Sequence, residues 1–110
     1  MAALGRVVFK GKSGKTYRFK VYPLGTRFRK ISGVYIVGNR SHGSNGGRRL
    51  VPLYVGHTED FSQPFGQHHK AQQCTARGAN CICLQSDAVE ESRLATERDL
   101  VARLHPACND

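Results

Sequence analysis

Hydrophobic and polar residues alternate in the first part of the chain. In the segment 16–22 every second residue is apolar, and the residues between them are mostly basic. A shorter apolar run at 7–10 precedes this segment, across a glycine-containing turn at 11–15. Alternation with a period of two is typical of a strand with one buried face, so the pattern predicts a β-hairpin with an apolar face and a basic face. The apolar positions of its second strand are Tyr17, Phe19 and Val21.

Two further apolar runs, at 34–37 and 50–55, lie on either side of a basic, glycine-rich loop at 38–49. Glycine and asparagine tolerate the positive φ angles of turns, so this arrangement predicts a second β-hairpin with a long loop. The runs contain the strings Gly-Val-Tyr and Tyr-Val-Gly, which would place Tyr35 and Tyr54 on neighbouring strands. The two phenols could then reach one surface, or they could be ordinary half-buried sheet residues.

The last part of the chain predicts a helix over 87–104. Asp87 is the expected N-cap, Glu90 has the spacing of a capping box, and Pro106 follows the end of the helix. The residues that fall on one apolar arc are Leu94, Leu100, Val101 and Leu104.

Glu97 lies in the middle of this apolar arc. A carboxylate that faces a core is unfavourable unless a cation, a metal ion or hydrogen-bond donors compensate for its desolvation. The alternative is that Glu97 lies at the edge of the sheet and extends to water. Its position therefore makes Glu97 a candidate functional residue.

These residues resemble the motifs of the GIY-YIG nuclease domain. The two tyrosine strings are similar to the pair of motifs that name the family, and Thr-Glu-Asp-Phe at 58–61 resembles the entry to the helix that follows. Glu97 matches the glutamate of the last helix, and Asn109, in Pro-Ala-Cys-Asn at 106–109, matches the terminal asparagine. The resemblance covers about residues 32–109 and rests on the set of motifs in this order.

The resemblance implies metal-dependent hydrolysis of a phosphodiester in nucleic acid, with DNA favoured over RNA. Glu97 would hold a divalent cation, Mg²⁺ or Mn²⁺, that polarises the phosphate. Tyr35 or Tyr54 would orient or deprotonate the attacking water, and His68 would help to activate it. Asn109 would hold the site together through hydrogen bonds.

One position departs from the family pattern. The family has an arginine on the helix after the second motif, and an ungapped alignment from Tyr54 places Pro64 there and His68 on the family histidine. Proline cannot hold a phosphate and disfavours a helix interior, so we expect a regular helix only over about 67–74. The side chains that could supply the missing charge are His68, His69, Lys70 and Arg77. Without such a charge, the fold would serve as an inactive nucleic-acid-binding module.

The elements together predict an α+β fold. We expect a GIY-YIG-like three-stranded antiparallel core sheet flanked by helices, with its third strand in the apolar run 81–84, and we expect the N-terminal β-hairpin to extend this sheet. The chain divides into a basic N-terminal extension, 1–31, and a GIY-YIG-like domain, 32–110. At 110 residues the two parts form one compact unit.

The net charge of +9 is unevenly distributed. Residues 1–50 contain 12 of the 17 basic side chains and no acidic one. Such a segment calls for an anionic partner, and nucleic acid is favoured because clustered cations release counterions from phosphates. The alternative is a protein-interaction domain that binds an acidic protein surface. The predicted nucleic-acid-binding residues are Lys10, Lys12, Lys15, Arg18, Lys20, Arg27, Arg29, Lys30, Arg48 and Arg49.

The chain has four cysteines, and no pair of them has the two-residue gap common in zinc sites. We interpret them as reduced thiols that pack as small apolar side chains. The alternative is a metal site drawn from Cys74, Cys81, Cys83, His68 and His69. No apolar segment is long enough for a membrane span, and the N-terminus lacks a signal-peptide pattern, so a cytoplasmic location is expected.

Overall fold

The computed structural model describes residues 3–42 and 47–109. The strands are β1 (Gly5–Lys10), β2 (Thr16–Pro23), β3 (Gly33–His42), β4 (Arg48–Thr58) and β5 (Cys81–Ser86). The helices are the 3₁₀-helix η1 (Phe65–Gln67) and the α-helices α1 (Ala71–Ala76) and α2 (Glu90–Leu104). The predicted loop 38–49 is shorter than expected, because β3 and β4 extend into it from both ends. Residues 43–46 of that loop lie outside the described residues.

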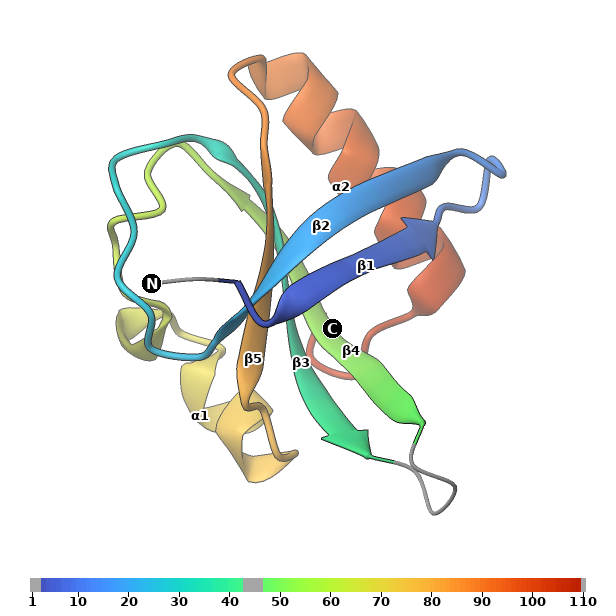
Figure 1. Cartoon of the computed structure of the whole chain (residues 1–110). Helices are drawn as coiled ribbons and strands as arrows, with labels where there is room; N and C mark the ends of the chain where they lie inside the picture. The colour runs from blue at the N-terminus through green and yellow to red at the C-terminus, as the bar shows by residue number, and fades with distance from the viewer. Residues whose placement is uncertain (1–2, 43–46, 110) are drawn as a thin grey trace.

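The strands form one antiparallel sheet in the order β1-β2-β5-β3-β4. The fold is therefore α+β, as predicted, and the N-terminal hairpin extends the sheet because β2 pairs with β5. Figure 1 shows α2 lying across one side of the twisted sheet, while α1 lies on the other side, near the start of β5. No helix among the described residues is long and apolar enough to cross a membrane.

The sheet separates two apolar clusters. On the α2 face, Phe19, Ile36 and Leu100 belong to one cluster, and all three are fully buried. On the opposite face, which we call the tyrosine face, Tyr35 and Cys74 belong to the second cluster. The alternation predicted for β2 is confirmed, because its three apolar side chains are buried while the basic residues between them are exposed. Val101 and Leu104 pack against the first cluster, as the helical arc predicted, and Leu94 is half-buried.

Two helix boundaries differ from the predictions. The helix expected over 67–74 is replaced by η1 and by α1, which begins only at Ala71. Asp87 is not the N-cap of α2: the helix begins at Glu90 after an extended Val89. The Asp87 carboxylate instead accepts a hydrogen bond from the Val89 backbone N–H at 3.0 Å, which forms a local turn before the helix.

Candidate functional site

The two motif tyrosines lie on adjacent strands of the tyrosine face. Tyr35 on β3 is opposite Gly56 on β4, and Tyr54 is opposite Val37, so the two phenols are diagonal neighbours. Their ring centroids are 6.0 Å apart. A Cβ atom at Gly56 would lie 2.6 Å from the Tyr35 hydroxyl oxygen. The glycine of the second motif therefore leaves the space that the phenol of the first motif occupies.

Both phenols are held in the protonated form. Burial, and then the negative charge of Glu97, raise the pKa of Tyr54. Burial is also the main reason that the pKa of Tyr35 is raised, followed by Tyr54 and Glu97. Of the two, Tyr54 is the phenol better able to lose its proton.

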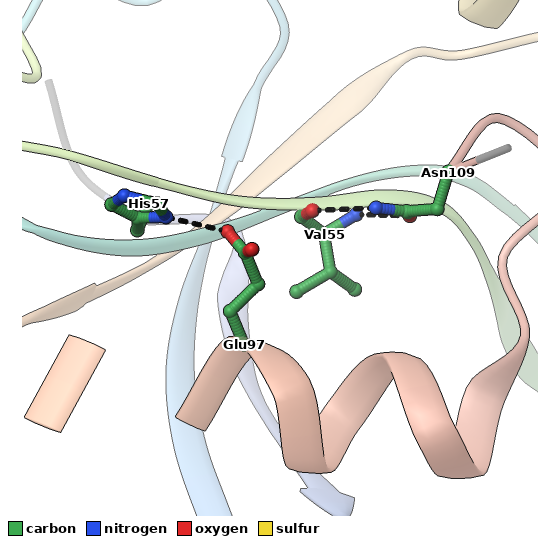
Figure 2. A network of polar contacts seen from close by, with 4 residues as sticks. All are labelled: Val55, His57, Glu97 and Asn109. Carbon is green, nitrogen blue, oxygen red and sulfur yellow. Dashed lines mark hydrogen bonds and ion pairs between the residues drawn. The ribbon is translucent and has the colours of Figure 1, made fainter. Parts of the chain in front are cut away.

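Glu97 extends from α2 to the edge strand β4. Its Oε2 atom lies 2.6 Å from Nδ1 of His57, and the two side chains are 25% and 33% exposed. Figure 2 shows the carboxylate pointing from the helix toward the imidazole. Within the described residues, the second carboxylate oxygen, Oε1, has no hydrogen-bond partner. The desolvation of Glu97 is thus compensated by His57, and one oxygen stays available to a ligand.

Asn109 joins the C-terminal segment to the same strand. Its Oδ1 atom accepts a hydrogen bond from the Val55 N–H, and its Nδ2 atom donates to the Val55 carbonyl, both at 2.8 Å (Figure 2). The Cys108 N–H also donates to the Leu53 carbonyl at 2.8 Å. The side-chain amide of Asn109 therefore pairs with the free backbone edge of β4 at Val55, the residue that follows Tyr54.

His68 packs against Tyr54, with ring centroids 5.1 Å apart, and stacks on Phe65 and His69. The Lys70 backbone N–H donates to Nδ1 of His68 at 3.0 Å, so Nδ1 carries no proton. Burial lowers the pKa of His68, and the charges of His69 and Lys70 lower it further. With Nδ1 as an acceptor, the neutral imidazole carries its proton on Nε2 and offers a donor there, next to Tyr54.

A groove of about 1000 Å³ opens on this face, and we call it the tyrosine groove. Residues 24–28 and 60–68 form its walls, together with Tyr35 and His57. Pro64 lines it at the position where the resemblance would place an arginine. Among the described lining residues, Arg27 is the only lysine or arginine and Asp60 the only carboxylate. Arg77 and Lys70 do not line the groove, so the positive charge available there comes from the N-terminal extension.

The predicted nucleic-acid-binding residues do not form a single patch. Some of them line a second concavity of about 580 Å³ on the tyrosine face, between β2, β5 and the segment 26–31. We call it the basic hollow. Its cationic residues are Arg6, which the sequence analysis did not include, and Arg18, Lys20, Arg27 and Arg29.

The other predicted cations lie elsewhere. Lys12 and Lys15 are in the β1–β2 turn, where Lys15 lies over the Tyr17 ring and close to the Asp99 carboxylate. Lys10 ends β1 at this same turn. The hydrogen bonds of Ser62 lower the pKa of the Asp60 carboxyl, and the charge of Lys30 adds a small part to this effect. Arg48 and Arg49 begin β4, at the far end of the β3–β4 hairpin. Only the hollow brings several cations together next to the groove.

The four cysteines are reduced and fully buried. Burial raises the pKa of the Cys74 thiol to about 12, and a hydrogen bond with Cys108 adds to this effect. In the part of the chain that the structure describes, no group of three or more histidine, cysteine, aspartate or glutamate side chains could hold a metal ion. The described residues thus offer no cysteine-based metal site, whereas a cation bound by Glu97 alone does not require such a group.

Comparisons with family models, with curated proteins and with solved structures give no match to this chain. The relationship to the GIY-YIG nuclease domain therefore stays a prediction that rests on the motifs.

His57 is the residue of the site that sequence analysis missed. The sequence did show an ionisable side chain directly after the second tyrosine motif, in a strand where the preceding residues, Val55 and Gly56, are buried. The role of His57 could not be inferred from this signal, because its contact with Glu97 exists only once α2 is packed across β4.

Proposed function

We propose that this chain binds nucleic acid and hydrolyses its phosphodiester bonds with a divalent cation held at Glu97. The observation that supports this proposal is the arrangement of Glu97. His57 fixes one oxygen of the carboxylate, the other oxygen is unpartnered among the described residues, and its charge acts on both motif tyrosines. Tyr35 and His57 line the tyrosine groove, and Glu97 reaches His57 from the α2 side of the sheet. A carboxylate at the border of a groove, with its charge acting on two phenols, is a suitable arrangement for phosphoryl chemistry.

The donor set fits a hard cation. Mg²⁺ commonly binds through one or two carboxylates and takes its remaining ligands from water and substrate phosphates. Oε1 of Glu97 is an oxygen ligand of that kind. When bound, Mg²⁺ or Mn²⁺ would act as a Lewis acid that neutralises charge developing on the phosphate.

The side chains of the site have separate tasks in this proposal. His57 orients the Glu97 carboxylate through the 2.6 Å contact. The hydroxyl oxygen of Tyr54 can accept a hydrogen bond from the attacking water and so orient it. The approach of a positive charge would lower the raised pKa of Tyr54, and once the phenol had released its own proton to solvent, the phenolate could accept the proton of the water. His68 offers its Nε2–H as a donor close to Tyr54.

The second candidate function is a nucleic-acid-binding module without turnover. The observation in its favour is the scarcity of positive charge in the groove, where Pro64 stands at the expected arginine position and only Arg27 is cationic. In enzymes that transfer or hydrolyse phosphoryl groups, Arg or Lys side chains that stabilise the reacting phosphate contribute a large part of catalysis. The small positive charge of the groove therefore favours binding over cleavage.

Glu97→Gln separates the two candidates. We expect wild-type protein to cleave plasmid or single-stranded DNA with Mg²⁺ or Mn²⁺, and we expect Glu97→Gln to lose this activity while it keeps its affinity measured in EDTA. Glutamine preserves the volume and a hydrogen bond to His57 but removes the charge. Glu91→Gln, which changes an exposed carboxylate in the first turn of α2, is the matched control and should cleave like wild type.

Binding by both proteins without cleavage by either would support the binding module. Cleavage that survives Glu97→Gln would contradict the assignment of the metal ligand, since it would come from other residues or from a contaminant.

A further inference from the structure

The basic hollow is a concentration of positive charge without compensation. Five cationic side chains line it, no aspartate or glutamate does, and all five residues are exposed. Among the described residues, none of the five forms an ion pair with a carboxylate. Like charges held this close repel one another and destabilise the fold, so the arrangement is suited to an anionic ligand.

The hollow and the tyrosine groove are continuous. Thr26, Arg27, Phe28 and Phe61 line both of them. A series of aromatic rings also connects them: Phe28 lies 5.1 Å from Tyr22 and 6.4 Å from Phe61, and Phe61 lies 6.5 Å from Tyr35. A linear polyanion in the hollow would therefore reach Tyr35 by crossing Arg27 and Phe28.

The lining favours a single strand over a duplex. Aromatic rings beside a basic track are the usual means of binding single-stranded nucleic acid, since they stack on base faces that a duplex keeps inside. Tyr22 and Phe28, which are half-buried, are the rings of this series that can do so, whereas Phe61 and Tyr35 are buried in the apolar cluster beneath them. Arg18 and Lys20 are two residues apart on one face of β2, or about 6.6 Å.

We propose that a single-stranded nucleic acid binds along the basic hollow and enters the tyrosine groove across Arg27, which holds the phosphate nearest to Tyr35. This inference rests on the proposed function and specifies its substrate class. It gives the N-terminal extension a direct part in the site, because Arg6, Arg18, Lys20 and Arg27 all precede the first tyrosine motif.

The test is fluorescence anisotropy in EDTA, over a range of salt concentrations, with a labelled oligothymidylate, a single-stranded RNA and a DNA duplex. The hollow variant is Arg18→Gln with Lys20→Gln, and the junction variant is Arg27→Gln. Arg98→Gln with Arg103→Gln, two exposed residues of α2, is the matched control for the first. Arg103→Gln, an exposed residue of the last turn of α2, is the control for the second.

We expect wild-type protein to prefer single strands to duplex. The slope of log affinity against log salt should become shallower by about 1.4 in the hollow variant and by about 0.7 in Arg27→Gln, because each phosphate contact on a single strand contributes about 0.7. The controls should keep the wild-type slope. The relative affinities for oligothymidylate and RNA identify the natural strand.

A preference for duplex would overturn the inference, and so would equal losses in the variants and their controls; in both cases the proposed function would stand. If wild type bound none of the three ligands at low salt, the proposed function would fail together with the inference.

Discussion

Replacement of Asn109 by alanine should destabilise the protein by detaching the C-terminal segment from the edge of the sheet. Both polar atoms of the Asn109 side chain form hydrogen bonds with the backbone of Val55: Oδ1 accepts from the Val55 N–H, and Nδ2 donates to the Val55 carbonyl. The alanine variant removes both bonds and leaves the backbone of Val55 without these partners at an edge that water can partly reach.

The magnitude follows from the number of bonds. A hydrogen bond of this kind contributes a net of about 0.5–1.5 kcal/mol, so two of them contribute about 1–3 kcal/mol. For small proteins the dependence of unfolding free energy on urea is about 1–3 kcal/mol per molar. The urea midpoint of Asn109→Ala should therefore fall by roughly 1 M. Circular dichroism is the suitable signal, because the chain has no tryptophan.

Asn80 provides a matched comparison for stability. Its side chain makes the same pair of bonds with the backbone of Arg40, at 2.8 and 2.9 Å, on the strand next to β4. Asn80→Ala should lower the midpoint by a similar or smaller amount, because Asn80 is exposed whereas Asn109 is half-buried.

The reasoning would be refuted if Asn109→Ala kept the wild-type midpoint and yet lost cleavage per folded molecule. That result would mean that the Asn109 amide acts on the reacting groups and not as a clamp between the C-terminal segment and β4.

Two further predictions concern the tyrosines. Gly56→Ala should displace the Tyr35 phenol and weaken any cleavage, because the new Cβ would lie 2.6 Å from the hydroxyl, whereas Gly5→Ala has open space and should behave like wild type. Ultraviolet titration should show Tyr17 ionising at a pKa of about 12, owing first to burial and then to its hydrogen bond to Asp99, and this step should vanish in Tyr17→Phe. Because the pKa of Tyr17 is raised in the folded state, the protonated phenol stabilises the folded protein fully below pH ~10, the ordinary phenol pKa. This stabilisation is lost as the pH rises through 12, so the urea midpoint should fall over that range.

Regular periodicity made the strands and the last helix predictable. In β2 and α2, the residues that must be buried recur with the period of the element itself, so Phe19 and Leu100 could be placed in the core before any coordinates were known. The tyrosines also met as predicted, because the hairpin that brings Tyr35 next to β4 depends only on local sequence.

The segment after Phe61 was harder to predict, because side chains there compete with helical hydrogen bonds. The Lys70 N–H bonds to the His68 ring, and His68 itself is extended. At the other end, Gly78 adopts a φ of 86° that closes α1. Neither effect is apparent from hydrophobic periodicity, and together they reduce the expected helix to six residues.

Of the Glu97–His57 pair, only Glu97 could be predicted from the sequence. The sequence shows that a carboxylate on an apolar arc needs a partner, but the identity of that partner depends on how α2 is rotated and where it crosses the sheet. That placement is decided by the packing of Leu100 and its neighbours against both hairpins, which is a property of the whole core.

The strand order explains why the N-terminal extension contributes to the candidate site. Since β5 lies between β2 and β3, the chain leaving β2 must pass over the tyrosine face before it enters β3, and this passage carries Arg27 and Phe28 to the groove. Arg27 therefore supplies a cation to the groove, which Pro64 also lines without offering one. The same crossing places the uncompensated charges of β2 next to the groove, so the proposed binding of an anion and its access to Tyr35 depend on one topological feature of the sheet.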